Sequence, residues 1–339
     1  MQESISLRML ARGEKVDPER VLATVLYDPS ERGDDGEFLG VVPLQTLEDS
    51  GVAHAMFAMD GSIRSGVQGP LRVRCGEHLC TGYVALDEAD FPGAGPVAPV
   101  QRAAEFSYDL IFKATEEMGY PHLVRCWNYF PRINEWENGL ERYRHFNVGR
   151  RRAFDRAGRL PDAIAPAASA LGTSQGQVVI YFLASRQVPD AIENPRQVSA
   201  YRYPNQYGPV SPLFSRGALL SLPWKSQVIF ISGTASIVGH QSVHVGDVAA
   251  QTAETVRNLE AVIDQANLRA TNGKFSLSDL RLRVFLRYPS DLPQVKRALF
   301  AKLGPAIDVT WLHADICRAD LLVEIEGFGL PGTVRARPC

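Results

Sequence analysis

Hydrophobic and polar residues alternate along Leu321–Glu326, and this period of two predicts a β-strand. Its apolar face carries Leu321, Val323 and Ile325. Its other face carries Leu322, Glu324 and Glu326. A carboxylate within an apolar strand is costly unless it is paired or protonated, so Glu324 is a candidate general acid, with Cys317 upstream as a candidate helper. The alternative is that Glu324 and Glu326 form the solvent-facing side of an antiparallel strand.

Other hydrophobic patterns predict further elements along the whole chain. Short apolar runs predict strands at Arg20–Tyr27, Phe38–Pro43, His78–Ala85, Leu123–Phe130, Val178–Leu183, Gln227–Ser232 and Leu280–Arg287. Apolar residues three and four apart predict helices at Arg102–Gly119, Glu135–Phe154, Ala249–Ala266 and Leu292–Leu303. The polar stretch Ser30–Gly36 predicts a turn, and the small, proline-containing stretch Leu160–Gln177 predicts a passage between two halves.

The order of elements in the first half recurs in the second, which predicts an internal duplication. Gly82 and Gly233 correspond at an offset of 151 residues, and each is followed by a helix, a strand, a second helix and a last apolar strand. The expected fold is α+β, with two pseudo-symmetric units and helices packed on mixed sheets. The N-terminal half covers residues 1–160, with its last strand at about 177–185, and the C-terminal half covers 186–330. The alternative is that two unrelated α/β units look alike.

The predicted duplication also bears on function. Tyr181 lies in the first copy roughly where the second copy has Glu324, so the candidate acid is present once. A duplicated scaffold with one modified copy suggests a single working cleft.

Composition excludes several classes of protein. The chain has 339 residues, of which 45% are hydrophobic and 22% charged, so it can bury a sizeable core. Its net charge of −2 and the lack of a long basic run give no indication of nucleic-acid binding. We expect no membrane segment and no targeting sequence, because no apolar run reaches spanning length. The cysteines are few and scattered, which favours free thiols in a reducing cytoplasm: Cys75, Cys80, Cys126, Cys317 and Cys339.

Candidate binding residues come from two regions rich in arginine. The Tyr- and Pro-rich stretch from Tyr201 to Arg216 can present phenol hydroxyls and a guanidinium to an anion, although an ordinary surface loop is equally compatible with it. Most arginines of Glu141–Arg152 are expected on a solvated helix face, with Arg150 kept as a candidate ligand for the substrate. Arg297 precedes the last strand and could face the same cleft.

Metal and nucleotide sites are not expected. Cys75, His78 and Cys80 lack a second pair of ligands nearby, and His240 and His244 lie in a strand-like, glycine-flanked stretch. The chain has no dinucleotide-binding fingerprint and no serine-hydrolase elbow.

At about residues 200–328 the chain resembles the RidA/YjgF, chorismate mutase-like fold. The segments that carry this resemblance are Tyr207-Gly208-Pro209, VIFISG (228–233), DVAAQTAETVRNLEAVIDQANL (247–268), LRLRVFLRYPSDLPQVKRALF (280–300) and VEIEG (323–327). Nearly the whole of residues 20–328 is similar to a narrower family, the chorismatases. That similarity rests on RCWNYFPRIN (125–134), GLERYRHFNVGRRRAF (139–154), NPRQVSAYRYP (194–204) and the pair of Cys317 with Glu324.

The resemblance implies an enzyme that cleaves the enol ether of chorismate and releases pyruvate. It implies Glu324 as the proton donor to the enolpyruvyl methylene, with Tyr207, Arg216 and Arg297 around the substrate. Further candidate substrate-binding residues are Ser232, Gly233, Ala235 and Arg150. It associates a cysteine at position 317 with 3-hydroxybenzoate as the product. The loop Gly233–Ser236 is a second candidate for control of the product. Neither a metal nor an organic cofactor is implied.

Several alternatives remain open at this stage. Water could instead add to the protonated substrate and give a dihydrodiol, 3,4-dihydroxycyclohexa-1,5-dienecarboxylate. The chain could also be a RidA-like imine or enamine deaminase, or a metabolite-binding module without catalysis. Apart from a small-molecule substrate, neither nucleic acid nor membrane is an expected partner, and the chain is expected to be a monomer or a homotrimer.

Overall fold

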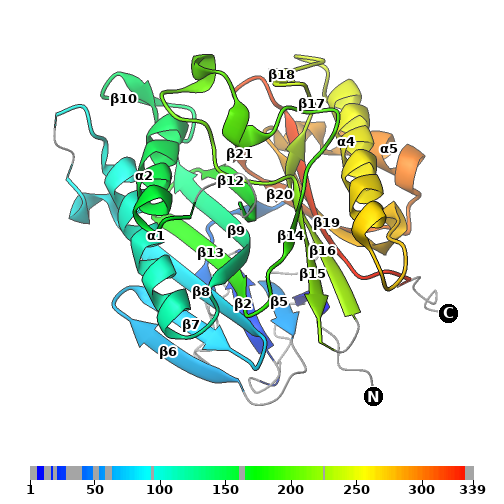
Figure 1. Ribbon diagram of the computed structural model, residues 1–339. Helices are drawn as coiled ribbons and strands as arrows, with labels where there is room; N and C mark the ends of the chain where they lie inside the picture. The colour runs from blue at the N-terminus through cyan, green and yellow to red at the C-terminus, as the bar shows by residue number, and fades with distance from the viewer. Residues whose placement is uncertain are drawn as a thin grey trace.

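Two large mixed sheets meet at the centre of the molecule, and helices cover the outer side of each (Figure 1). The structure is a computed structural model that describes residues 6–10, 17, 21–27, 40–48, 53–57, 63–92, 95–159, 165–223 and 226–332. The helices of the first sheet are α1 (Pro99–Glu117) and α2 (Arg142–Arg156). Those of the second sheet are α4 (Val248–Arg269) and α5 (Leu292–Leu303). The prediction of an α+β fold with helices packed on mixed sheets is confirmed.

The two sheets have the same strand order, as a duplication requires. The first runs β12-β9-β13-β8-β7, with β6 beyond β7: β6 (Arg64–Gln68), β7 (Leu71–Cys75), β8 (Leu79–Leu86), β9 (His122–Pro131), β12 (Ala167–Thr173) and β13 (Val178–Ser185). The second runs β20-β19-β22-β16-β15, with β14 beyond β15: β14 (Asp190–Ile192), β15 (Gly217–Leu222), β16 (Ser226–Ala235), β19 (Leu280–Leu286), β20 (Asp308–His313) and β22 (Val323–Gly329). In each sheet the first pair is parallel and the next two pairs are antiparallel. The two pseudo-symmetric units are confirmed.

The strand registers place the candidate acid at the position that Tyr181 occupies in the first copy. Tyr181 on β13 pairs with Trp127 on β9, and Glu324 on β22 pairs with Phe285 on β19. Both pairs lie two residues beyond an arginine, Arg125 in β9 and Arg283 in β19.

Each half also contributes a short strand to the sheet of the other half. Strand β21 (Asp315–Ile316) pairs antiparallel with β12 of the first sheet, and β4 (Gln45–Thr46) pairs with β20 of the second. The residues that follow β21 therefore lie where the two halves meet. Apart from these two exchanged strands, we propose that the chain divides into its two halves near residue 186.

The sequence predicted that Leu160–Gln177 is a passage between the two halves, but this stretch also contains the strand β12. Small residues are needed there because β12 packs closely on the other half: the backbone N–H of Ala168 donates to the hydroxyl of Ser232 on β16, at 2.9 Å. Residues 160–164 of that prediction, together with Ser30–Gly36, Arg20 and residues 38–39, lie outside the described residues.

The predicted helix at Glu135–Phe154 begins later than expected, after a hairpin. The hairpin consists of β10 (Trp136–Glu137) and β11 (Leu140–Glu141). Asn138 and Gly139 between them have φ values of 50° and 80°, as a two-residue turn of this kind requires. Glu141 is therefore the residue that precedes α2, at its N-cap.

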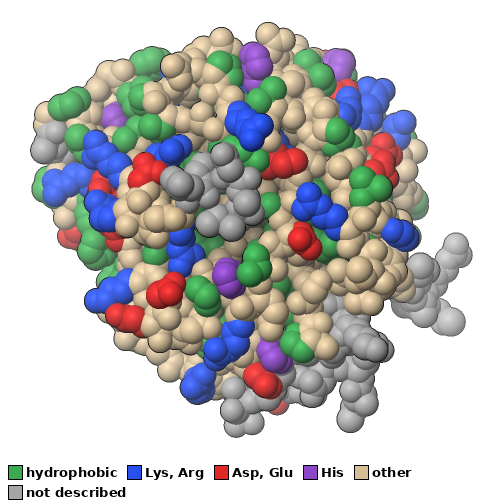
Figure 2. Space-filling view, viewed as in Figure 1, with side chains coloured by type: hydrophobic (Ala, Val, Ile, Leu, Met, Phe, Trp, Pro, Cys, Tyr) green, Lys and Arg blue, Asp and Glu red, His purple; other side chains and the backbone are tan. Residues whose placement is uncertain are grey.

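Smaller elements complete the fold. A four-stranded sheet contains β1 (Ser6–Leu10), β5 (Ala53–Phe57), β2 (Val21–Leu26) and β3 (Gly40–Val41). A second hairpin consists of β17 (Ile237–Val238) and β18 (Gln241–Ser242). Single turns of 3₁₀-helix are η3 (Glu88–Asp90), η4 (Ala200–Arg202), η5 (Asn205–Tyr207), η6 (Leu277–Asp279) and η7 (Pro289–Asp291). Figure 2 shows acidic and basic side chains interspersed over one face of the molecule.

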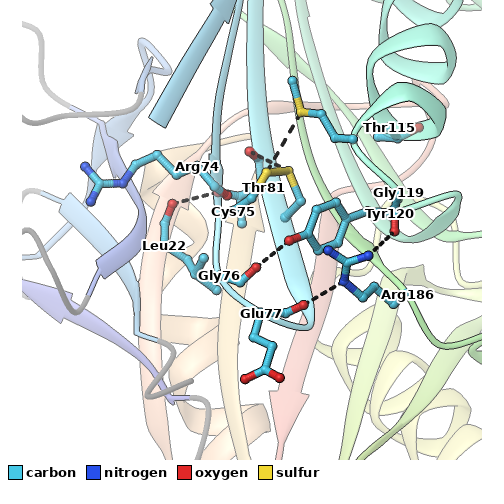
Figure 3. Close-up of a disulfide and its surroundings, with 12 residues drawn as sticks. Leu22, Arg74, Cys75, Gly76, Glu77, Thr81, Thr115, Gly119, Tyr120 and Arg186 are labelled. Carbon is cyan, nitrogen blue, oxygen red and sulfur yellow. Dashed lines mark hydrogen bonds between the residues drawn. A yellow bond between two sulfur atoms is a disulfide. The ribbon is translucent and has the colours of Figure 1, made fainter. Parts of the chain in front are cut away.

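The expectation that all cysteines are free thiols is wrong for one pair. Cys75 and Cys80 form a disulfide across the β7–β8 hairpin (Figure 3), because the strand register puts them directly opposite each other. Cys126 and Cys317 are free, and Cys339 lies outside the described residues. None of the described helices is long and apolar enough to cross a membrane.

Candidate active site

A cavity of about 320 Å³ lies between the two halves and gathers most of the predicted site residues. From the second half it is lined by Tyr207, Arg216, Gly233, Ala235, Cys317 and Glu324. From the first half it is lined by Glu141, Tyr143 and Arg144, at the start of α2. One chain therefore supplies both walls.

Glu324 occupies the wall of this cavity as a buried carboxyl group. Only 3% of the residue is exposed. Burial is the main cause that raises its pKa to about 8, the charge of Glu326 raises it further, and Arg125 opposes the rise. At neutral pH most of this carboxyl group therefore carries a proton, as a general acid must.

The neighbouring carboxylate, Glu326, has the opposite environment. Its oxygens accept hydrogen bonds from the guanidinium groups of Arg125 and Arg283, from Ser169, and from the indole of Trp127 at 3.1 Å. Because only 2% of Glu326 and 3% of Glu324 is exposed, the solvent-facing alternative for this strand is wrong. The ion pairs compensate the burial of Glu326 and leave Glu324 without such compensation.

A glycine makes room for the acid. A Cβ atom added at Gly233 on β16 would overlap the Oε1 atom of Glu324, and the backbone N–H of Gly233 donates to the hydroxyl of Ser169, at 3.0 Å. The carboxyl group of Glu324 thus lies directly against the backbone of Gly233. This close approach is the physical reason for glycine at that position.

The buried acid predicts a stability that falls as pH rises. The folded pKa of Glu324, about 8, is above its usual value of 4.5, so its contribution to stability is fully present below pH 4.5 and is lost as pH approaches 8. Relative to Glu324→Gln, the wild type should therefore lose on the order of 4 kcal/mol between those pH values. Denaturant unfolding at pH 5 and pH 8 measures this difference, with Glu260→Gln on the exposed face of α4 as the control. A difference that does not change with pH would mean that Glu324 is not a buried acid.

Among the described residues, three guanidinium groups line the cavity, those of Arg216, Arg318 and Arg144. Arg216 donates through Nη2 to the hydroxyl of Tyr203 (2.8 Å) and to the carbonyl of Val198 (2.9 Å), while its buried Nε bonds no described group. Arg318 donates through Nη1 to the carbonyl of His240 (2.9 Å) and lies 4.1 Å from the ring centre of Tyr207. Such groups suit a ligand with more than one carboxylate.

Tyr207 joins the cationic wall to the β17–β18 hairpin. Its hydroxyl lies 3.1 Å from Nδ1 of His240, and its ring packs against Tyr203 with 5.4 Å between the ring centres. Tyr203, Tyr207 and Arg216 of the Tyr201–Arg216 stretch thus line the cavity.

Cys317 is a neutral thiol on the cavity wall. Burial raises its pKa to about 12, with a further rise from the charge of Glu324. Burial likewise raises the pKa of Tyr143 above its usual value, with Cys317 as the next cause. A thiol in this state is a poor nucleophile but can fill space and donate a weak hydrogen bond.

Two buried side chains hold the backbone of residues 315–322, which carries Cys317 and Arg318. The guanidinium of Arg287, just after β19, donates to the carbonyls of Leu321 (2.9 Å), Ile316 (3.0 Å) and Arg318 (3.0 Å) and to the carboxylate of Asp315 (2.7 Å). Gln251 on α4 donates to the carbonyl of Asp320 (2.9 Å) and accepts from the N–H of Leu322 (2.8 Å). These hydrogen bonds thus fix the position of this loop.

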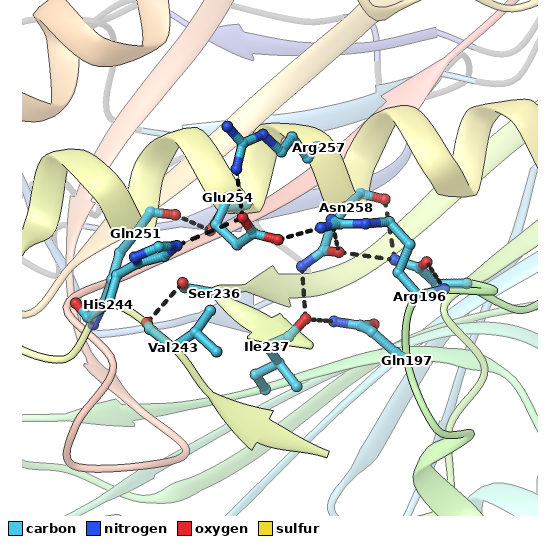
Figure 4. Close-up of polar contacts among 12 residues, drawn as sticks. Arg196, Gln197, Ser236, Ile237, Val243, His244, Gln251, Glu254, Arg257 and Asn258 are labelled. Carbon is cyan, nitrogen blue, oxygen red and sulfur yellow. Dashed lines mark hydrogen bonds and ion pairs between the residues drawn. The ribbon is translucent and has the colours of Figure 1, made fainter. Parts of the chain in front are cut away.

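Helix α4 also positions the β16 side of the cavity (Figure 4). Asn258 donates to the carbonyls of Ala235 and Ile237, both at 3.0 Å, and these two residues line the cavity. Next to Asn258, the carboxylate of Glu254 accepts hydrogen bonds from Arg196 and Arg257. These contacts lock the end of β16 beside the acid.

Two predicted arginines do not reach the cavity. Arg297 is exposed on α5, which covers the outer side of the second sheet, so its proximity to the last strand in chain order does not place it in the cleft. Arg150 is buried within α2, with its guanidinium 4.9 Å from the ring centre of Tyr108 and 5.2 Å from that of Phe154. We therefore withdraw both residues as ligands for the substrate.

Ser232 likewise has a structural place rather than one on the cavity wall. Its hydroxyl donates to the carbonyl of Ser215 (2.6 Å) and accepts the N–H of Ala168 from the other half. It therefore helps to join the two sheets. Among the described residues, no group of three or more His, Cys, Asp or Glu side chains could hold a metal ion.

Comparisons with known proteins show the family to which the chain belongs. The family model described as "Chorismatase FkbO/Hyg5-like, N-terminal" matches residues 55–184. A protein of Streptomyces rapamycinicus named chorismatase is 39% identical over 83% of this chain and 83% of its own length. The chain belongs to the chorismatase family. A 3-hydroxybenzoate synthase of Streptomyces hygroscopicus is 40% identical over 72% of this chain and 74% of its own length. A crystal structure of a chorismatase at 1.08 Å resolution matches with a TM-score of 0.82 and 31% identity, over 96% of this chain and 98% of that one.

Within this chorismatase fold, sequence reasoning missed part of the first-half wall. Arg144 was among the arginines expected on a solvated helix face, and Glu141, Tyr143 and Arg318 were not singled out. A signal was available for three of them, because the segment GLERYRHFNVGRRRAF (139–154) carries the resemblance to the family. The position of Arg318 beside Cys317 offered no comparable pattern.

Proposed function

We propose that this chain cleaves the enol ether of chorismate, releases pyruvate and forms 3-hydroxybenzoate. The observation that carries the proposal is the buried carboxyl group of Glu324 on the wall of a cavity that, among the described residues, is lined by three arginines. Membership in the chorismatase family supports the substrate, and the relative named 3-hydroxybenzoate synthase supports the aromatic product.

The residues suit the first chemical step. Chorismate is a dicarboxylate, and the guanidinium groups of Arg216, Arg318 and Arg144 can bind and orient its two carboxylates. Glu324 then protonates the methylene carbon of the enolpyruvyl group, which creates an oxocarbenium ion. A carboxyl group with a pKa of about 8 keeps the required proton at neutral pH.

The second step decides the product. If water adds to the cation, the ring is released as the dihydrodiol; if the ring's own hydroxyl intervenes, the ring aromatises to 3-hydroxybenzoate. Cys317 is a neutral, half-buried thiol on the same wall, so it occupies space that water could otherwise take. This supports the aromatic branch.

Product analysis tests the proposal. Purified protein incubated with chorismate should release pyruvate and an equal amount of 3-hydroxybenzoate, measured by chromatography. Cys317→Ala should retain pyruvate release and shift the aromatic product towards the dihydrodiol, because the smaller side chain admits water. An unchanged product would remove Cys317 from the choice of branch. Chorismate left intact, with ammonia released from an enamine, would favour the RidA-like deaminase, and binding without turnover would favour a non-catalytic module.

We propose that the protein is a monomer or a homotrimer and that it is located in the cytoplasm. Because one chain supplies both walls of the cavity, a monomer suffices for the site, and a homotrimer is the second expectation.

A further inference from the structure

A second carboxyl group lies on the wall of the same cavity, in the opposite half of the molecule. Glu141 ends β11 and occupies the N-cap of α2, and its side chain is 16% exposed. It lines the cavity together with Glu324 and Cys317. The proposed role of Glu324 as the acid leaves Glu141 without a function.

The environment of Glu141 differs from that of Glu324. Its Oε2 accepts a hydrogen bond from Nε of Arg144 at 3.1 Å, and its Oε1 accepts one from the amide of Asn134 at 3.3 Å. Burial raises the pKa of Glu141 above its usual value, whereas Asn134, Arg144 and Arg318 lower it. The charged and titratable groups that face it are Arg144 on α2 and Arg318 and Cys317 on the 315–322 loop. Hydrogen-bond donors and cations therefore favour its ionised form, while burial makes it a stronger base than a free glutamate.

The two carboxyl groups face the same space. The charges of Glu324 and Glu141 both raise the pKa of Cys317, so the thiol lies within electrostatic reach of both. One cavity thus contains a buried carboxyl group without an ion-pair partner, Glu324, and a carboxyl group that accepts hydrogen bonds from a guanidinium and an amide, Glu141. Two carboxyl groups whose environments favour opposite protonation states are suited to act as an acid and a base.

The reaction needs such a base in either branch. When Glu324 has given its proton to the methylene carbon, a second proton must leave the reacting atoms. In the aromatic branch, the oxygen of the ring hydroxyl forms a bond to the ring carbon that bears the ether, the C–O bond from that carbon to the enolpyruvyl group breaks with release of pyruvate, the hydroxyl oxygen then leaves its original carbon, and a ring carbon loses a proton as the ring aromatises. In the water branch, the water that adds to the cation loses a proton, and the resulting hemiketal then breaks its C–O bond as the ring oxygen gains one.

We propose that Glu141 is the catalytic base that accepts this second proton. In the water branch, Glu141 takes the proton of the attacking water; when the hemiketal collapses, Glu141 returns that proton to the ring oxygen, and the hemiketal hydroxyl reprotonates Glu324. In the aromatic branch, Glu141 takes the ring proton, so one proton enters at the methylene and one leaves from the ring; exchange with solvent restores both carboxyl groups. The assignment rests on the proposed function.

Steady-state kinetics with chorismate between pH 4.5 and pH 9.5 test this assignment. The wild type should give a bell-shaped dependence of kcat on pH, with an alkaline limb from Glu324 near pH 8 and an acid limb from Glu141. Glu141→Gln should lower kcat by about 10²-fold and remove the acid limb. Glu141→Asp keeps a carboxylate and a good N-cap, so it should recover part of kcat and the acid limb. The control, Glu135→Gln, changes an exposed carboxylate near the same hairpin and should behave as the wild type.

Each contrary outcome has a distinct meaning. If Glu141 only holds Arg144 in place, Glu141→Gln should raise KM while kcat and its acid limb stay unchanged, and that result overturns the assignment. If circular dichroism shows that Glu141→Gln is unfolded, Glu141→Asp alone tests the assignment. The acid limb of this variant must then lie at a different pH from that of the wild type if the carboxyl group is the base. A wild type that releases no pyruvate overturns the proposed function and the base together, whereas an active wild type with an unchanged acid limb in both variants overturns the base alone.

Discussion

Replacing Glu324 by glutamine should lower pyruvate release from chorismate by about 10²–10⁴-fold. The amide has nearly the same shape as the protonated carboxyl group, so the cavity and the binding arginines should be preserved. It has no acidic proton to transfer to carbon. Because the interaction lost is one made in the transition state, the loss should be in kcat, with KM changed little.

The pH dependence of the wild type provides an independent check. Glu324 must be protonated to act, and its pKa is about 8. The alkaline limb of the profile should therefore begin near pH 8, and well above that pH kcat should fall about tenfold per pH unit. The measurement is initial-rate pyruvate release across this range, with circular dichroism to exclude unfolding.

A comparison of two variants separates the acid from the volume that it fills. Glu324→Asp keeps an acid but moves it away from the substrate. This variant should therefore be more active than Glu324→Gln, and its kcat should still fall at alkaline pH. Pyruvate release by Glu324→Gln at the wild-type rate would end the assignment of Glu324 as the acid.

Much of the second-half wall could be predicted from sequence because local patterns carry it. The alternation in Leu321–Glu326 identified Glu324 as a polar residue on an apolar strand, and the Tyr and Arg content of Tyr201–Arg216 marked that stretch as a candidate anion-binding loop. The family resemblance then singled out Tyr207 and Arg216. These signals lie within single elements. The structure then brings the elements together at one cavity.

The remainder depends on pairings between distant parts of the chain. Glu141 and Glu324 belong to different halves, and only the packing of the two sheets puts them on one cavity. Chain order was a poor guide for Arg297, because the helix after a strand crosses to the outer side of its sheet. The disulfide was missed because the register of β7 and β8, rather than the spacing of the cysteines, places Cys75 opposite Cys80.

The duplication explains how the acid stays protonated. Arg125 comes from one copy and Arg283 from the other, and both bind Glu326, which lies two residues beyond Glu324 on β22. The paired arginines thus stabilise the buried carboxylate of Glu326, while Glu324, the residue that replaces Tyr181 in the second copy, receives none of their hydrogen bonds. The remaining charge of Glu326 helps to keep the proton on Glu324.

Replacing Gly233 by alanine should reduce kcat by about 10²-fold without unfolding the protein, because the added methyl group must displace the carboxyl group of Glu324. The displaced atoms belong to the end of a side chain, so the backbone of β16 need not move. The same substitution at Gly66 on β6 is the matched control, since an added Cβ there would lie 3.2 Å from a methyl group of Val73 and far from the cavity. Kinetics with chorismate and thermal unfolding should be measured on both variants. Activity of Gly233→Ala within about twofold of the wild type would show that the position of the acid against this backbone does not matter to the reaction.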